Sequence, residues 1–272
     1  MEKGTIWQAA IGLQQVDGLK PSTYLLDTAK QNIDGDITFA EVKNRIEEYY
    51  KTATSRQASK EDRTEEADKV SVRIVEILSE NTFSFSPDGY LDIHRRLFAG
   101  IYEFAGKIRA YNITKAEWAL NGDTVLYAGA GNLSATLEHD FNKEKKFSYK
   151  QLTQQQTIEH LACFISDLWQ IHPFGEGNTR TTAVFLIKYL RKLDFKNVNM
   201  GVFARHSLYF RNALVRANYK NPKDNIHSTN EYLECFLRNL LLGEKNALKN
   251  RELQTPFKNQ ATPCLGEIFT NA

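Results

Sequence analysis

One apolar stripe, between Gln154 and Gln170, constrains the fold more than any other feature of the sequence. Its members recur with the roughly 3.6-residue period of a helix that is buried along one side; they are Ile158, Leu161, Ala162, Ile165, Leu168 and Trp169. A glycine-rich loop at 175–177 follows, and the segment from Thr181 to Leu193 is again largely apolar. Two core helices joined by a short loop predict an all-α protein.

The segments before this pair add one more helix and one exception. Ser86-Pro87 is typical of a helix start, and an apolar face from Tyr90 to Ile101 predicts a helix that ends near Gly106. Between Ile108 and Tyr127 the pattern breaks into short β-prone pieces around Asn121-Gly122, a dipeptide favoured in tight turns. We therefore expect one small β-hairpin within the helical fold.

Shifts in composition divide the chain into four parts. Residues 1–51 form a helical N-terminal segment, and residues 52–69 are charged and rich in serine and threonine, as linkers are. Residues 70–245 form the main domain. Residues 246–272, which include two prolines and show no periodicity, predict a loosely held C-terminal tail.

Composition and charge exclude several classes of protein. A chain of 272 residues that is 42% hydrophobic is not disordered, and a net charge of +2 does not suit coating nucleic acid or an anionic membrane. We expect neither as a partner. Three cysteines lie far apart without a C-x-x-C pair, which favours a reducing compartment. No basic leader precedes an apolar stretch, and no apolar run reaches the roughly 18 residues of a spanning helix, so we expect a cytoplasmic protein.

The loop between the two core helices has the residues of a phosphate site. Gly175 and Gly177 permit close backbone approach, and the free N–H groups at the start of the next helix attract an anion. Arg180 can bind phosphate oxygens with its planar fork of donors, and Asn178 can orient one of them. Without a ligand, Asn178 and Arg180 would be a helix cap and a surface charge.

The same loop contains a base and a carboxylate. His172, with an ordinary pKa of about 6.5, is the natural base to take a proton from an attacking hydroxyl. Glu176 is a hard oxygen ligand suited to Mg²⁺ on phosphates, although an acid at a helix start is favourable without any metal. Phe174 is expected to anchor the loop inward.

The segment from His172 to Arg180 resembles the signature H-P-F-x-[D/E]-G-N-G-R of the Fic (Fic/Doc) family and differs only at Thr179, where glycine is usual. The similarity extends to Ile93–Phe98 and Tyr102–Arg109, and covers about Ser86 to Leu242. The resemblance implies a Fic fold, a helical bundle with a hairpin flap. It also implies an enzyme that transfers AMP from ATP to a protein hydroxyl and releases pyrophosphate.

The resemblance further implies roles for the loop residues. His172 would deprotonate the target Ser, Thr or Tyr, and Glu176 would hold Mg²⁺ on the α- and β-phosphates. Gly175, Gly177, Asn178 and Arg180 would line the phosphate pocket. These assignments would make the chain a nucleotidyltransferase with ATP and Mg²⁺ as its cofactors.

Two further segments match the family outside the loop. Lys115-Ala116-Glu117-Trp118 corresponds to the flap, which would cover the nucleotide and clamp the target protein by strand addition; the alternative is an ordinary loop. Asn218 matches a position near the adenosine. The resemblance implies a target protein, with self-modification as an alternative.

Thr179 is the departure that bears on the reaction. In the family this position lies close to the distal phosphates, and Doc-type members have lysine there and transfer a phosphate instead of AMP. Thr179 adds bulk without charge, which favours AMP transfer and leaves a Doc-type phosphotransferase or another nucleotide as alternatives.

The N-terminal segment resembles a small antitoxin-like domain whose [S/T]-x-x-x-E-G helix inhibits Fic enzymes through a Glu–Arg pair. Leu13 and Asp17 stand at the Ser and Glu positions, and Gly18 follows. Asp17 is one methylene shorter than the usual glutamate. The alternatives are pairing of Asp17 with Arg180, which would make Asp17 and Gly18 regulatory, and a simple turn between helices.

Two other classes of protein are alternatives to a Fic enzyme. His94, His139-Asp140, His160 and Asp167 are residue types of a metal-dependent phosphohydrolase of the HD type, although His94 and His160 also suit packing or surface positions. The other class is an inactive binding module, which would have no need for the combination of His172, Glu176, Asn178 and Arg180.

Overall fold

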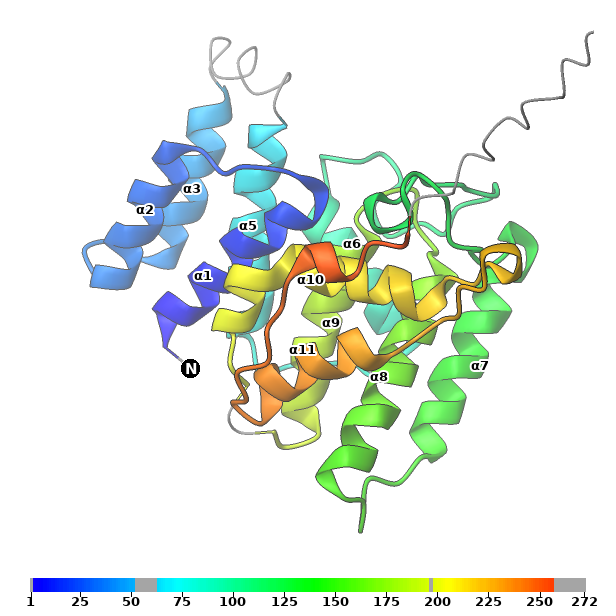
Figure 1. The fold of residues 1–272 in the computed structure, drawn as a ribbon. Helices are drawn as coiled ribbons and strands as arrows, with labels where there is room; N and C mark the ends of the chain where they lie inside the picture. The colour runs from blue at the N-terminus through cyan, green and yellow to red at the C-terminus, as the bar shows by residue number, and fades with distance from the viewer. Residues whose placement is uncertain (1, 52–62, 196–197, 257–272) are drawn as a thin grey trace, which may run out of the picture.

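The computed structural model describes residues 2–51, 63–195 and 198–256, and these residues form an all-α protein (Figure 1). Apart from an isolated bridge between Asn221 and Ile226, no β pairing occurs in these ranges. The helices are α1 (Lys3–Gly12), α2 (Thr23–Asp34), α3 (Phe39–Lys51), α5 (Thr64–Ser79), α6 (Pro87–Phe98), α7 (Leu133–Lys146), α8 (Gln154–Ile171), α9 (Asn178–Lys192), α10 (Gly201–Asn218) and α11 (Glu231–Leu241).

Helices α8 and α9 occupy the core, as their apolar patterns predict. Helix α8 starts at a capping box, in which Thr153 and Gln156 satisfy each other's backbone N–H groups. Every residue of α9 from Asn178 to Leu190 is buried, and α9 contacts α5, α6 and α8. Helix α9 begins at Asn178 instead of Thr181 because Gly177 takes a left-handed conformation directly before it. The loop thus lies between two helices that the core holds in place.

The N-terminal segment is helical, as expected, and its first helix is part of the main packing. Helix α1 lies against α5 and α10, while α2 and α3 form an outer pair beside α5 (Figure 1). The buried Asp68 carboxylate of α5 holds this pair, because it accepts the Ser22 N–H at 2.8 Å and the Tyr50 hydroxyl at 2.6 Å. Burial raises the pKa of Asp68. The boundary of a separate regulatory domain stays a prediction.

Two predicted boundaries are wrong. The helix expected to reach Gly106 ends at Phe98, because Ala99 leaves the helical conformation and Gly100 and Gly106 both have positive φ. The expected linker 52–69 lies partly outside the described residues, and from Thr64 onward it is helix α5, whose inner face contacts α1 and α9. The charged residues at the start of α5, which include the buried Glu66 and Asp68, account for the prediction of a linker.

The prediction of a loosely held tail over residues 246–272 is wrong for the part of it that the structure describes. Residues 246–256 pack against the body, with Leu253 fully buried and the Thr255 N–H donating to the Ala119 carbonyl at 2.8 Å. Residues 257–272 lie outside the described residues. In the described ranges no helix combines the length and the apolar character needed to cross a membrane.

The predicted hairpin over 108–127 forms its turn and not its strands. Asn121 and Gly122 both have positive φ, and the Asp123 N–H donates to the Leu120 carbonyl at 3.1 Å, as a hairpin turn requires. Beyond the turn, the arms enclose a hollow of about 530 Å³, lined by residues 112–114 and 124–129. We call residues 112–129 the flap.

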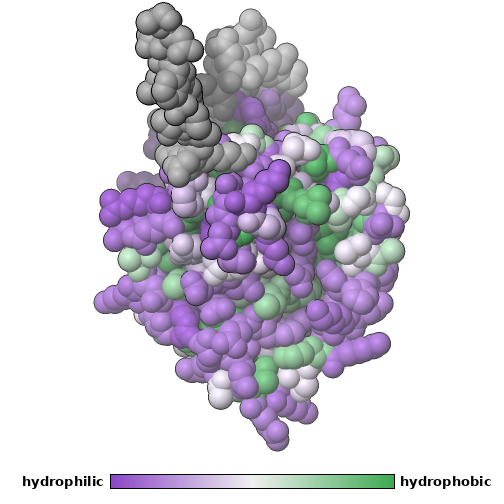
Figure 2. All heavy atoms as spheres, turned by 45° about the vertical axis from the view of Figure 1, so that its right-hand side comes forward, coloured by the Kyte–Doolittle hydropathy of each residue, from purple (hydrophilic) through white to green (hydrophobic). Residues whose placement is uncertain are grey.

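The arms of the flap do not pair because their backbone groups are bonded elsewhere. Arg109 donates to the carbonyls of Tyr111 and Ala128. The Ala128 N–H donates to Gln170 at the end of α8, and the Gln170 side chain donates to the Leu126 carbonyl at 3.0 Å. These hydrogen bonds to residues outside the flap take the place of the strand-to-strand hydrogen bonds that local β propensity predicts. Figure 2 shows the molecule turned toward the α7 side, where a mostly hydrophilic surface has hydrophobic residues gathered in its upper part.

Candidate active site

Two glycines that pack against aromatic rings shape the loop between α8 and α9. Gly177 has a φ of 79°, and a Cβ there would lie 2.4 Å from the Phe98 ring. A Cβ on Gly175 would lie 2.7 Å from the Tyr111 hydroxyl. Neither position accepts a side chain without displacing its neighbour. Because Gly177 directly precedes α9, the free N–H groups of that helix start lie at the loop.

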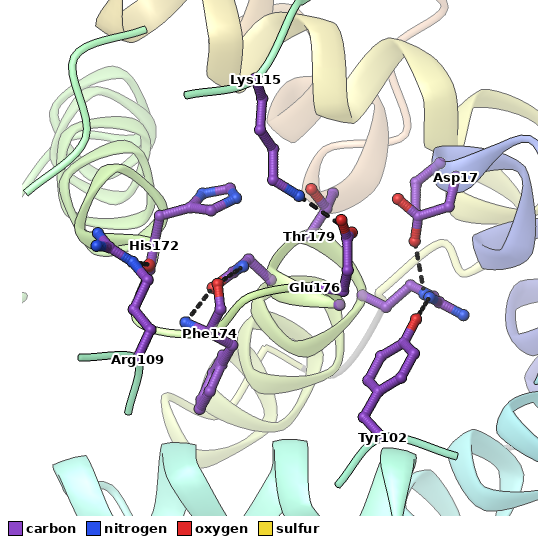
Figure 3. Close-up of polar contacts among 12 residues, drawn as sticks. Asp17, Tyr102, Arg109, Lys115, His172, Phe174, Glu176 and Thr179 are labelled. Atoms are coloured by element: carbon purple, nitrogen blue, oxygen red, sulfur yellow. Dashed lines mark hydrogen bonds and ion pairs between the residues drawn. The ribbon is translucent and has the colours of Figure 1, made fainter. Parts of the chain in front are cut away.

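Phe174 and Asn178 hold the loop in shape (Figure 3). The Phe174 ring is fully buried, which confirms its role as an inward anchor. The Asn178 amide accepts the Phe174 N–H at 3.1 Å and donates to the Phe174 carbonyl at 2.8 Å. Both ends of this amide are therefore engaged within the loop, and its contribution in this structure is to fix the loop backbone at the predicted phosphate site.

His94 braces the loop from α6. Its ring stacks on the Phe174 ring with centroids 3.6 Å apart. Its Nδ1 accepts the Gly106 N–H at 2.8 Å, so the proton is on Nε2, which donates to the Glu176 carbonyl at 3.0 Å. Burial lowers the pKa of His94 to about 4. His94 is therefore neutral and has a structural role, in agreement with the alternative that it is a packing residue.

His172 ends α8 in a left-handed conformation, with a φ of 50°. Its Nδ1 lies 3.2 Å from the Trp169 carbonyl, an acceptor, so the proton of the neutral ring is on Nδ1. The His172 carbonyl accepts Nε of Arg109 at 2.8 Å, which fixes the residue from the other side (Figure 3). Among the described residues no hydrogen bond engages Nε2, whose lone pair is therefore available.

The surroundings keep His172 neutral. Burial lowers the pKa of His172 well below 6.5, and the positive charges of Lys115, Arg211 and Arg109 act in the same direction against the weaker effect of the Trp169 carbonyl. The Tyr127 ring also lies against it, with centroids 4.2 Å apart. A neutral imidazole with one free nitrogen is the form that accepts a proton.

Glu176 is the exposed acid of the loop. Its side chain is 48% exposed, and its Oε2 lies 3.0 Å from Nζ of Lys115, which reaches down from the flap (Figure 3). The predicted metal ligand and the predicted flap lysine are therefore brought together. No other carboxylate of the described chain pairs with this lysine.

Thr179, the departure from the Fic signature, has a structural partner. Its hydroxyl accepts Nε1 of Trp169 at 3.0 Å, and both residues are buried. Trp169 is also the residue whose carbonyl holds His172. The hydroxyl that replaces a glycine thus fixes the indole beside the predicted base.

Arg180 is fully buried and surrounded by residues from the N-terminal part of the chain. Its Nη1 donates to the Gln14 amide oxygen at 3.0 Å and its Nη2 to Glu66 at 2.6 Å, while Nε lies 2.9 Å from Asp17 in an ion pair without hydrogen-bond geometry. Burial opposes the charge, but Asp17 and Glu66 outweigh it and raise the pKa of Arg180. The pairing of Asp17 with Arg180, one of the two alternatives from sequence, is present, and the Arg180 side chain is fully buried.

The remaining predicted residues differ in their surroundings. In the flap, Ala116 and Trp118 are exposed, whereas Glu117 points inward and is 2% exposed. Asn218, at the end of α10, donates to the carbonyl of Ser166 on α8 at 3.1 Å. Gly18 ends the 3₁₀ helix η1 (Leu13–Asp17) with a φ of 71°.

The set of histidines and aspartates that suggested a phosphohydrolase does not converge. His94 contacts the Glu176 carbonyl, His160 contacts Glu144 at 2.7 Å, and His139 is exposed. Across the described residues, no group of three or more metal-ligating side chains gathers. The geometry offers no support for that alternative.

Sequence reasoning missed two residues of the site. Glu66 lies in the charged stretch that predicts a linker, and Trp169 belongs to the apolar stripe, which predicts only that it is buried. Glu66 contacts Arg180, which is remote in sequence, and Trp169 contacts Thr179 on the other side of the loop. Neither contact produces a pattern among neighbouring residues of the sequence. Acids in the first turn of α5 favour a helix start there, and this is an indication that the sequence offers for Glu66.

Comparison with known proteins identifies the domain. Residues 84–190 match the model of the Fic/DOC family. The chain contains a Fic domain. It is 27% identical over 145 residues to protein adenylyltransferase VbhT of Bartonella schoenbuchensis, and 32% identical over 119 residues to probable protein adenylyltransferase y4lH of Sinorhizobium fredii.

These similarities are partial. The first match covers 49% of this chain and 29% of the relative, and the second covers 40% and 58%. Among solved structures, the N-terminal FIC domain of Bep8 protein from Bartonella sp. 1-1C matches with a TM-score of 0.44 and 17% identity, over 66% of this chain and 85% of that one. The Fic domain here thus rests on the match of residues 84–190 to the family model, and the chain spans about a third to three fifths of the length of these two relatives.

Proposed function

We propose that this chain transfers AMP from ATP to a hydroxyl side chain of a target protein, its own copies included. The observation that supports this most directly is the state of His172, a buried neutral imidazole whose Nδ1 is held by the Trp169 carbonyl and whose Nε2 is free. It adjoins a loop whose glycines and helix start suit phosphate. The relatives named protein adenylyltransferase agree with the proposal.

His172 is the proposed general base. Its Nε2 takes the proton of the target hydroxyl while the hydroxyl oxygen bonds to the α-phosphorus and the bond to pyrophosphate breaks. The Trp169 carbonyl, which accepts the Nδ1 proton, keeps the ring in this tautomer and favours the cation that forms. Thr179 supports the same arrangement because it fixes the Trp169 indole.

The loop and the flap would bind the nucleotide. Gly175, Gly177 and the start of α9 offer backbone N–H groups to the phosphates. Mg²⁺ commonly binds through one or two carboxylates together with substrate phosphates, and the exposed carboxylate of Glu176 fits that set. When bound, the ion would neutralise phosphate charge. Lys115, Ala116 and Trp118 would cover the nucleotide, and Asn218 would lie near the adenosine.

Thr179 bears on which group is transferred. Its hydroxyl is neutral and accepts a hydrogen bond from the Trp169 indole. It therefore contributes no positive charge to hold an additional phosphate. A lysine at this position would provide such a charge. We therefore infer AMP transfer in preference to the phosphate transfer of Doc-type members.

We also propose that η1 restrains the enzyme. Arg180 has no free route to a phosphate while Asp17, Glu66 and Gln14 surround its guanidinium. Gly18 permits the left-handed end of η1 that places Asp17 against Arg180. Activity would then require that this segment move and release Arg180.

The test uses the purified chain with Mg²⁺ and ATP labelled separately at the α- and γ-phosphates, with bacterial lysate as the source of targets. Protein-bound label from the α-position is the expected result, with none from the γ-position. His172→Ala should abolish incorporation, because it removes the proposed base.

A second variant separates restraint from inactivity. Asp17→Asn, which removes the charge at constant shape, should raise incorporation of α-label. Incorporation from the γ-position alone would instead make the chain a phosphotransferase. Full activity of His172→Ala would contradict the assigned base, and an unchanged rate in Asp17→Asn would contradict the restraint by η1.

A further inference from the structure

Arg211 on α10 lies between the flap and η1 and contacts both. Its Nη2 donates to Oε2 of Glu117 in the flap at 3.0 Å. Its Nη1 donates to the Val16 carbonyl of η1 at 2.7 Å and lies 3.6 Å from Oδ1 of Asp17 in an ion pair. The Arg211 side chain is 23% exposed. The Arg211 guanidinium therefore connects the flap with η1.

On the flap side, Arg211 holds the residue that closes the turn. The Glu117 backbone N–H donates to Asp123 at 2.9 Å, and the Glu117 carbonyl accepts the Gly122 N–H at 3.0 Å. The other carboxylate oxygen of Glu117 accepts the Tyr127 hydroxyl at 3.0 Å. Since Glu117 is buried, a displacement of its carboxylate must move the turn that bears it. That turn is part of the proposed nucleotide cover.

On the η1 side, Arg211 holds the segment that surrounds Arg180. Asp17 lies between the two arginines, with Oδ1 facing Arg211 and Oδ2 facing Nε of Arg180. One turn earlier on α10, the Ser207 hydroxyl donates to the Gly12 carbonyl, directly before η1. Helix α10 is therefore the surface on which η1 rests, and Arg211 is its charged contact.

Charge balance ties the two contacts together. Two carboxylates, on Glu117 and Asp17, share Arg211 in a largely buried setting, where an acid that loses its cation is left uncompensated. If η1 withdraws, Arg211 loses the Val16 carbonyl and the Asp17 charge and is free to follow Glu117. If the flap moves, Arg211 can follow it only by weakening its contacts with η1.

We propose that Arg211 is a positioning residue that couples the flap to η1, so that release of Arg180 and movement of the nucleotide cover occur together. Coupling of this kind is reciprocal, because a change at either end must alter the stability of the other. Its consequence for catalysis rests on the proposed function, whereas the coupling itself does not.

Hydrogen exchange of the full chain tests the coupling without any substrate. Glu117→Gln keeps the size of the flap residue and removes its charge, and Asp17→Asn does the same in η1. We expect Glu117→Gln to raise amide exchange in residues 12–19, and Asp17→Asn to raise it in residues 113–126, each by about threefold or more. Arg211→Met should do both, and Arg211→Lys should restore part of the protection.

The matched control is Thr124→Val. Thr124 is also in the flap, and its hydroxyl accepts the Lys115 N–H at 3.3 Å without contacting Arg211. This change should loosen the flap and leave residues 12–19 as in the wild type. Exchange in residues 137–165 of α7 and α8 should stay constant in every variant.

Two results would overturn the proposal. In the first, Glu117→Gln and Arg211→Met loosen the flap while residues 12–19 keep wild-type exchange. In the second, exchange rises evenly over the whole chain, which would assign Arg211 to stability alone. Because the readout is exchange and not label transfer, failure of the coupling leaves the proposed transferase standing, and absence of label transfer leaves the coupling testable.

Discussion

His94 makes this fold sensitive to acid, and replacing it should remove a measurable part of that sensitivity. The ring is fully buried, and each nitrogen has one partner, the Gly106 N–H on Nδ1 and the Glu176 carbonyl on Nε2. A proton added to Nδ1 would face the Gly106 N–H, a donor, so the cation would lose a hydrogen bond and the loop would lose its brace.

The size of the effect follows from the pKa of His94. Burial lowers it from 6.5 to about 4, and each pKa unit corresponds to about 1.4 kcal/mol. The unfolded chain takes up this proton as the pH falls below 6.5, but the folded chain does so only near pH 4. The contribution of His94 to the free energy of unfolding is therefore complete above pH 6.5 and is lost toward pH 4, a loss of about 3 kcal/mol.

Urea unfolding between about pH 7 and about pH 5 measures this loss. The free energy of unfolding of the wild type should fall with decreasing pH more steeply than that of His94→Gln, by about 1 kcal/mol per pH unit. His139→Gln is the matched control, because His139 is exposed, and it should keep the wild-type slope. Parallel lines for wild type and His94→Gln would refute the reasoning.

Three further outcomes follow from the site. Thr179→Val leaves the buried Trp169 N–H unpaired and should lower the free energy of unfolding in urea by about 1–3 kcal/mol. Thr179→Ser keeps the hydrogen-bond acceptor and should lower it by about 1 kcal/mol, for the lost methyl group. Equal losses in the two variants would contradict the hydrogen bond. Gly177→Ala places a Cβ 2.4 Å from the Phe98 ring at a φ of 79° and should cost about 2 kcal/mol or more; an unchanged melting temperature would disprove the close contact. Because the pKa of His172 lies well below 6.5, the acid limb of label transfer should also lie well below pH 6.5, and a half-maximal rate near 6.5 would count against the assignment.

The elements that local patterns determine were predicted from the sequence. The stripe of α8, the start of α6 at Ser86-Pro87 and the turn at Asn121-Gly122 all form where expected, because periodicity, capping and turn preferences act over a few residues. The loop from His172 to Arg180 was located for the same reason, since its glycines and its position between two helices are visible in sequence.

Tertiary structure alone decided where the charged side chains of this loop point. Arg180, expected among the phosphates, is buried against Glu66 and Asp17, which are remote in sequence, and Glu117 of the flap points inward to Arg211. Away from the turn, the Ala128 N–H and the Leu126 carbonyl of the flap likewise bond to Gln170 of α8 instead of to the opposite arm. Such pairings depend on which surfaces the packed helices bring within a few ångströms. Sequence by itself determined the helices and the loop between them, whereas the packing of α1, α5 and α10 determined the partners of its arginine.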